Sequence, residues 1–463
     1  MTEKLIVAGL LLPIIFLVTF SVWKKTFWFV LYWAVVVGAI RKWFLPQLAD
    51  VTLFSIHLFL FGLYCRVFFS KKIKTGKYGR PVTFLIAASI LWGCVSFVNP
   101  RNPSAAVGVL GLIIYFYFVP FAYALPIAVT SFQELVRGLQ RFALFSAPIL
   151  LLGAVQYSLP ADHYLNRYVD ESMYVALVGG AARITSTFSY ISGYTAYLNA
   201  LVMILIFLFV AQKGKTWLRV VFFALLVLAF VNLFMTGSRG PVFISAISLA
   251  VYFMTTLKLG LKFFIKTLVW TLLVLGLVGL TVSQVGSLRV RASTAFNNFM
   301  LRTEQAKGDV SGRLEDTFTP FKFLDHAGLL GYGIGTTYQG AVRFVSDWGD
   351  MPRDFEEEPE RVVLEIGLVG YILTYGLRLV VLFYLLRLFF ALKIREHKLL
   401  ALSAFLFQVQ FLQLNGLVFN MTSGVFYWFF TGMLFALPMY DRQHLAQVNA
   451  RRASVAAGSS LKA

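Results

Sequence analysis

Apolar stretches recur along almost the whole chain of 463 residues, and short polar connections separate them. Each stretch approaches the ~20 residues that an α-helix needs to cross the hydrocarbon layer of a membrane. Backbone groups in lipid must pair within their own segment, and the chain lacks the alternating pattern of a barrel, so we expect helices. The sequence therefore predicts an all-α polytopic membrane protein with about 12–14 transmembrane helices. The predicted spans are residues 5–22, 26–40, 53–69, 82–98, 105–129, 142–159, 190–211, 217–235, 242–257, 263–283, 362–392, 399–413 and 424–440.

One polar segment interrupts this pattern late in the chain. It covers residues 285–361, far more than the ~4–6 residues of an ordinary connection. We expect a large loop of this kind to carry function. The chain then divides into N-terminal transmembrane helices (1–284), the loop (285–361), C-terminal transmembrane helices (362–440) and a polar tail (441–463) that we expect to be cytoplasmic and disordered.

The positive charge of the chain lies mainly in the connections between spans. The charged fraction is 13% and the net charge is +20. Lysine and arginine in short loops are typical of the cytoplasmic side of a membrane protein, so no nucleic-acid partner is expected. The densest basic cluster follows the third span, and alternation then places the loop 285–361 on the outer side, with residues 160–189 and 236–241. Arg41 and Lys42 also fall on the outer side, against the charge rule.

Three outer segments each present an arginine among small, turn-forming residues. Arg183 precedes the seventh span, and Arg313 lies in the long loop. Arg239 follows Ser238 in the tight connection between the eighth and ninth spans. A guanidinium group carries five donors in a planar fork that matches phosphate oxygens, and it stays charged. The three arginines therefore predict a diphosphate site, with the alternative that each anchors the protein to lipid headgroups.

An acidic run closes the long loop, and Glu365 follows it at the start of the next predicted span. The run predicts a carboxylate that acts as general base on an acceptor hydroxyl. A solvated charged segment and a divalent-cation site are the alternatives, although the spacing matches no known metal loop and we expect no metal. Arg361 and Glu365 stand at i and i+4 of a helix and are expected to pair, because an ionisable group in lipid usually has a partner. The candidate bases are Glu356, Glu357, Glu358 and Glu360.

Five short motifs follow one another between residues 183 and 375. They are Arg183-x-x-Ser-Thr-Phe, Gly237-Ser238-Arg239-Gly240, Gly312-Arg313-Leu314, the glycine-rich run 330–335 and Glu365-x-Gly367-Leu368-Val369-Gly370. In this order the motifs resemble those of the bacterial O-antigen ligase and Wzy-type polysaccharide polymerase superfamily.

The resemblance implies a GT-C-like helical fold in the bacterial inner (cytoplasmic) membrane, with the large loop and the active site at the periplasmic face. It implies that a glycan passes from undecaprenyl diphosphate to a sugar hydroxyl in one inverting displacement, without a metal or other cofactor. Arg239 and Arg183 would bind the diphosphate and Arg313 would orient it, with Ser238, Arg361 and Glu365 in supporting roles.

One departure from that superfamily bears on the activity. Its ligases carry a histidine followed by Asn, Ser or Gln at a set distance before G-x-x-G, and counting back from Gly367 puts Glu356 and Glu357 at these places. The missing histidine favours a glycosyltransferase that polymerises undecaprenyl-diphosphate-linked repeat units into a secreted or capsular polysaccharide. The expected partners are that lipid-linked glycan, membrane lipids and a chain-length regulator. The alternatives are an O-antigen ligase acting on a lipid A-core or other acceptor, and a transporter of a lipid-linked solute.

Overall fold

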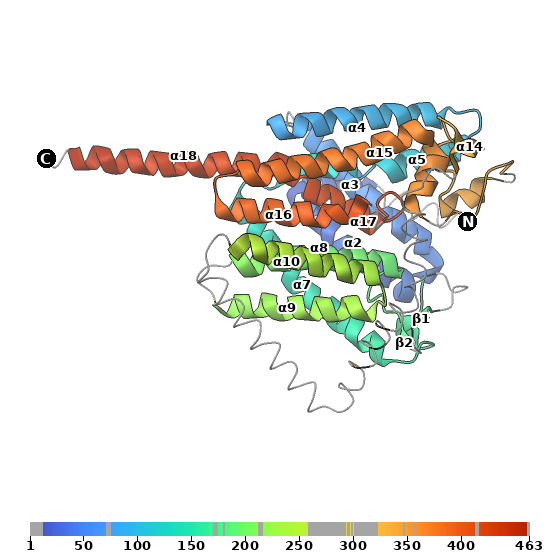
Figure 1. Ribbon diagram of the computed structural model, residues 1–463, viewed down its shortest axis with the longest axis horizontal. Coiled ribbons are helices and arrows are strands. Elements are labelled where there is room, and N and C mark those ends of the chain that lie inside the picture. The colour runs from blue at the N-terminus through green and yellow to red at the C-terminus, as the bar shows by residue number, and fades with distance from the viewer. Residues whose placement is uncertain are drawn as a thin grey trace.

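The protein is a bundle of helices that run roughly parallel to one common direction (Figure 1). The computed structural model describes residues 13–70, 76–169, 175–178, 181–211, 216–257, 323–345, 348–355, 357–412 and 416–460, and the single positions 293, 297 and 300. The main helices are α2 (Trp23–Ala39), α3 (Ala49–Ser70), α4 (Gly76–Phe97), α5 (Ala105–Phe116), α6 (Val119–Ala128), α7 (Phe132–Ser158), α8 (Ile191–Ala211), α9 (Thr216–Met235), α10 (Arg239–Leu257), α15 (Glu358–Ala391), α16 (Arg395–Val409), α17 (Met421–Thr431) and α18 (Met433–Ser460). The shorter elements are the π-helix η1 (Ile40–Phe44), the 3-10 helices η2 (Pro46–Leu48), η3 (Tyr164–Asn166), η5 (Gln339–Phe344) and η6 (Gln410–Leu412), the single-turn α14 (Leu324–Ala327), and the paired strands β1 (Leu177–Val178) and β2 (Ala181–Ala182).

The prediction of a multi-pass, all-α membrane protein is confirmed. Within the described ranges, eight helices are long and apolar enough to cross a membrane, or nine if the bent pair α5 and α6 forms one span. Helices α10 and α16 occupy two further predicted spans and are not among these eight. Of the predicted spans, 263–283 and the first part of 5–22 lie outside the described residues. Helix α8 is buried along nearly its whole length and packs against α9, α16 and α17, so it forms the centre of the bundle.

Helix α15 is broken at Gly367, where φ is 66° and ψ is −173°. Arg378 donates a hydrogen bond to Glu358, twenty positions earlier in the same element. A straight helix would separate these residues by ~30 Å, so the chain turns back sharply at Gly367. We call residues 358–366 the short arm and residues 368–391 the long arm. The predicted eleventh span, 362–392, therefore begins within the short arm, and the helix that continues through the bundle begins only after the break.

Backbone groups released by this break find partners in the glycine-rich turn of residues 328–335. The amides of Tyr332 and Gly333 donate to the carbonyl oxygens of Leu364 and Glu365 at 2.7 and 2.9 Å. Because unpaired backbone groups are costly in an apolar interior, these hydrogen bonds stabilise the sharp turn. A Cβ atom at Gly367 would collide with the backbone of Leu329, so the close approach of turn and break requires glycine there.

The connections predicted on one side of the membrane gather at one end of the bundle, the right-hand end in Figure 1, where α14, β1 and β2 lie. We call this the loop end. Its segments bond to one another: Asn99 donates to the Gly331 carbonyl oxygen at 2.8 Å, and Arg343 pairs with Asp50 at 2.6 Å. At the opposite end, the Lys393 amide donates to Asp441 at 3.1 Å.

The chain leaves the bundle through α18. This helix extends far beyond its neighbours and continues to Ser460 (Figure 1). The predicted disorder of the tail is therefore wrong up to that residue. Alanine is frequent in its last part, and because alanine is the best helix former, composition alone favoured helix there.

Candidate functional site

Arg183 joins two of the three arginine segments that the sequence singled out. Its Nε donates to the Thr236 carbonyl oxygen at 2.8 Å, and a terminal nitrogen donates to Ser238 Oγ at 2.8 Å. Arg239 is the next residue, is half-buried, and begins α10. The loop before α8 and the turn before α10 thus meet at the loop end of the bundle. Arg313 lies outside the described residues.

The turn that carries Arg183 is held in an unusual conformation. Ser186 has φ of 47°, the only positive φ of a non-glycine residue in the described part of the chain. The buried Gln156 side chain accepts from the Ser186 amide at 2.6 Å and donates to the Ser186 carbonyl oxygen at 3.1 Å. Left-handed backbone is costly for a residue with a Cβ atom and persists only where its surroundings impose it. The structure therefore holds the Arg183 turn rigidly.

A second clamp on this turn comes from η1, the π-helix that extends α2. Lys42 is 1% exposed, and its Nζ donates to Thr185 Oγ1 at 3.0 Å and to the Ser186 carbonyl oxygen at 2.6 Å. Arg41 donates to Ser189 Oγ at 2.7 Å, at the other end of the turn. Our sequence analysis gave neither residue a place in the site. One feature of the sequence could have identified them: both basic residues fall on the outer side of the membrane, where lysine and arginine are disfavoured.

The glutamates at the end of the loop make different contacts. Glu358 lies beside Arg378 in a buried ion pair, and its second oxygen accepts from the Val418 amide at 2.8 Å. Glu357 and Glu360 form a capping box at the start of the short arm, in which the Glu357 amide donates to Glu360 at 3.4 Å. Glu356 lies outside the described residues. Glu357, Glu358 and Glu360 are therefore built into the start of a helix, where Glu358 and Glu360 are buried and Glu357 is exposed.

Arg361 and Glu365 interact through Thr337 and not directly. Glu365 Oε1 accepts from the Thr337 amide and from Thr337 Oγ1, both at 2.7 Å. Arg361 donates to the Thr337 carbonyl oxygen at 2.8 Å and lies 3.5 Å from the ring centre of Phe419. The predicted pairing on one helix face is thus present as a shared contact with a third residue from the loop.

Tyr338 lies between this cluster and Arg41 of η1. Burial raises the pKa of the Tyr338 hydroxyl, while the nearby positive charges of Arg41 and Arg361 oppose the increase. Both guanidinium groups therefore lie within electrostatic range of one phenol. Basic side chains are therefore present at the Arg183 turn, at η1 and in the short arm of α15.

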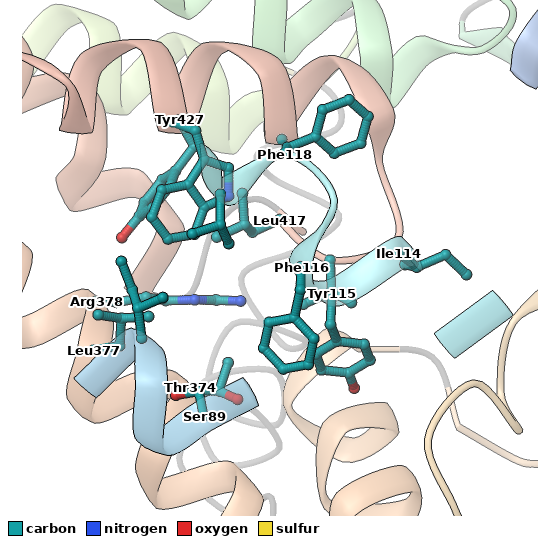
Figure 2. A pocket seen from close by; sticks show the side chains of 15 residues that line it. Ser89, Ile114, Tyr115, Phe116, Phe118, Thr374, Leu377, Arg378, Leu417 and Tyr427 are labelled. Carbon is teal, nitrogen blue, oxygen red and sulfur yellow. The ribbon is translucent and has the colours of Figure 1, made fainter. Parts of the chain in front are cut away.

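A cavity lies beside the short arm, between α4, the junction of α5 and α6, the long arm and α17. Figure 2 shows the guanidinium group of Arg378 pointing into it, with Tyr115, Ser89 and Tyr427 around it. Its volume of about 40 Å³ suits roughly three water molecules or one hydroxyl-bearing group. Its walls are mostly apolar, yet four polar atoms on them are buried without a hydrogen bond. These atoms are Ser89 Oγ, Tyr115 Oη, Tyr427 Oη and Arg378 Nε.

Within the described ranges, no three His, Cys, Asp or Glu side chains come together as a possible metal site. The chain matches no protein-family model and no curated protein. Its function is therefore argued from the geometry of the loop end.

Proposed function

We propose that the protein is a glycosyltransferase of the bacterial inner membrane that polymerises undecaprenyl-diphosphate-linked oligosaccharide repeat units into a secreted or capsular polysaccharide. The loop end would face the periplasm, and the transfer would be a metal-independent, inverting displacement. The observation that carries this proposal is the contact of Arg183 with Thr236 and Ser238. It brings two arginine-bearing turns together at the mouth of the bundle, where a lipid-linked substrate would present its diphosphate.

The positive charge around this contact suits a diphosphate leaving group. Arg183 and Arg239 belong to adjoining turns, and Arg41 and Lys42 bind the Arg183 turn from the other side. Guanidinium groups that are already oriented can neutralise charge as it develops on the leaving oxygen, which is usually the largest contribution of such a site. The backbone at the start of α10 adds the positive end of a helix dipole.

The acceptor hydroxyl needs a base, and the short arm of α15 would supply it. In the proposed step the acceptor oxygen forms a bond to the anomeric carbon while the bond from that carbon to the diphosphate oxygen breaks. The hydroxyl proton passes to a carboxylate, and the diphosphate leaves with its negative charge held by the arginines. The break at Gly367 turns the short arm back beside the long arm, and Arg361 in the short arm lies within electrostatic range of Tyr338, as Arg41 of η1 does.

A transporter of a lipid-linked solute is the second candidate. The broken helix α15 and the bent pair α5 and α6 favour it, since interrupted helices often surround transported solutes. The main polar contacts of the loop end, however, gather at one end of the bundle and suit chemistry at a membrane surface better than passage through it.

The test is incubation of the purified protein in nanodiscs with the undecaprenyl-diphosphate repeat unit of its host, with and without EDTA. A ladder of products on a gel that survives EDTA would support the polymerase. A single shifted product that requires an added acceptor would identify a ligase instead. If neither appears, and proteoliposomes carrying the protein move the lipid-linked substrate between leaflets, the transporter is correct and the transferase proposal fails.

A further inference from the structure

We infer that Glu365 is the carboxylate that accepts the proton of the acceptor hydroxyl, and that Tyr115 relays it. This inference rests on the proposed glycosyl transfer and assigns its base. Our sequence analysis gave Glu365 only a supporting role and placed the base among the glutamates at positions 356–360. The reason for the reassignment is the difference between the two best-defined carboxylates of the short arm.

Glu358 has both oxygens engaged. One accepts from Arg378, and the other accepts from the amides of Leu417 and Val418. A carboxylate whose two oxygens already bind a guanidinium group and two amides offers no free oxygen to a further hydroxyl group. Glu358 therefore ties the short arm to the long arm and α17.

Glu365 differs in its second oxygen. Oε1 accepts two hydrogen bonds from Thr337, but Oε2 is buried and has no hydrogen-bond partner. The residue is 0% exposed. An unsatisfied carboxylate oxygen in an apolar interior is expensive, and such groups usually mark function. Here the unsatisfied oxygen is the atom that can take up a proton.

Tyr115 lies between Glu365 and the cavity. Its hydroxyl is buried, forms no hydrogen bond of ordinary geometry, and lies close enough to Glu365 for the two side chains to interact. The same side chain lines the cavity (Figure 2). A hydroxyl group that enters the cavity can therefore reach Tyr115 although Glu365 itself is covered.

Arg361 and Thr337 are positioning residues in this arrangement. Thr337 Oγ1 accepts from Arg361 Nε at 3.2 Å and donates to Glu365 Oε1. The cation thus orients the carboxylate through an intermediate hydroxyl and does not pair with it directly, unlike Arg378 with Glu358. This leaves Oε2 available to accept a proton.

The proposed transfer moves two protons and one leaving group. The acceptor hydroxyl gives its proton to Tyr115 Oη as its oxygen bonds to the anomeric carbon, and the Tyr115 hydroxyl proton moves to Glu365 Oε2. The bond from the anomeric carbon to the diphosphate breaks, and its electron pair leaves with the diphosphate. Release of the proton from Glu365 to solvent restores the starting state.

The experiment compares Glu365→Gln, Tyr115→Phe and the wild type in the nanodisc assay, with donor binding measured separately by the thermal stabilisation that the lipid-linked donor produces. Gln keeps the shape of Glu and can still accept from Thr337. We expect Glu365→Gln to lose at least 100-fold in kcat and Tyr115→Phe at least tenfold, both with unchanged donor affinity. Tyr197→Phe is the matched control, because Tyr197 Oη is equally buried without a partner but lies in α8. It should keep wild-type activity.

Labelling with a membrane-permeant carbodiimide gives a readout that does not depend on turnover. This reagent reacts with a carboxyl group that can take up a proton, so mass spectrometry should find the adduct on Glu365 and not on Glu358, and Tyr115→Phe should change its rate. A Glu365→Gln variant with wild-type kcat would overturn the assignment while leaving the polymerase intact. A wild type that labels at Glu365 but transfers no glycan would overturn the proposed function and, with it, the role of Glu365 as its base.

Discussion

Arg378 and Glu358 form a buried ion pair within one interrupted helix, although twenty positions separate them in the chain. Arg378 also donates to the Phe411 carbonyl oxygen at 2.7 Å and lies 4.4 Å from the ring centre of Tyr375. The pair therefore closes the angle between the short arm and the long arm. Since the short arm carries Arg361 and Glu365, which both bind Thr337 of the loop, this ion pair holds the candidate base in place.

Removal of one member of this pair should be more harmful than removal of both. Glu358→Gln leaves the Arg378 charge buried without its partner, and we expect the free energy of unfolding to fall by about 3–5 kcal/mol. The double variant Glu358→Gln, Arg378→Met removes both charges and should recover most of the loss. Thermal unfolding in detergent, followed by circular dichroism, measures the difference. Equal destabilisation by the single and double variants would show that the pair does not act as a unit.

Gly367 should tolerate no side chain, whereas Gly376 should. Alanine at Gly367 would occupy a backbone region that is essentially restricted to glycine, at a cost of about 1–3 kcal/mol, and its Cβ would also collide with Leu329. Gly376 lies in the long arm with open space around it, and alanine there should stabilise the helix by up to about 1 kcal/mol. The two unfolding temperatures, measured side by side, should move in opposite directions. A neutral Gly367→Ala would argue against the turn at this residue.

The helices were predictable from sequence, but the turn within α15 was not. The stretch from Val362 to Leu392 is apolar apart from Glu365, Arg378 and Arg387, and Gly367 is one of three glycines in it. An isolated glycine in such a stretch is usually tolerated within a helix. The positive φ of Gly367 arises from its contact with residues 328–335, which the sequence places far away. Without this turn, neither the pair of Glu358 with Arg378 nor the role of Thr337 can be derived.

The site was predictable in part. Arginines next to tight turns are suited to bind phosphate, and this predicted Arg183 and the Ser238–Arg239 turn as site residues. The structure brings these segments together. The sequence could not distinguish among the glutamates, because their difference lies in hydrogen bonds to residues distant in the chain. Lys42 was not predicted as a site residue, because a basic residue beside a span usually lies at the membrane interface. Its burial depends on packing against the Arg183 turn, which the sequence does not show.

The two hydrogen bonds of Arg183 should require its planar guanidinium group. Lysine keeps the charge but cannot bond to both the Thr236 carbonyl oxygen and Ser238 Oγ with the same geometry. Since a hydrogen bond from a charged group contributes about 1.5–3 kcal/mol, we expect Arg183→Lys to lower kcat/KM for the lipid-linked donor by roughly 10- to 100-fold. Arg137→Lys is the control, because Arg137 is exposed near the start of α7, which faces the opposite end. The nanodisc polymerisation assay measures both, and equal activity of the two variants would remove Arg183 from the diphosphate site.

Lys42 should govern the rigidity of the Arg183 turn. Lys42→Met keeps most of the apolar stem but removes the bonds to Thr185 and Ser186. The left-handed backbone at Ser186 is then held by Gln156 and by the bond from the Ser186 hydroxyl to the Ile149 carbonyl oxygen. We expect amide hydrogen exchange of peptides that cover residues 183–189 to accelerate at least tenfold, and the KM for the lipid-linked donor to rise. Lys24→Met, at an exposed position at the other end of α2, should change neither quantity. Hydrogen exchange followed by mass spectrometry reports on the turn directly and needs no substrate. Unchanged exchange in Lys42→Met would mean that the bonds to Gln156 and Ile149 hold the turn and that Lys42 is not needed for its rigidity.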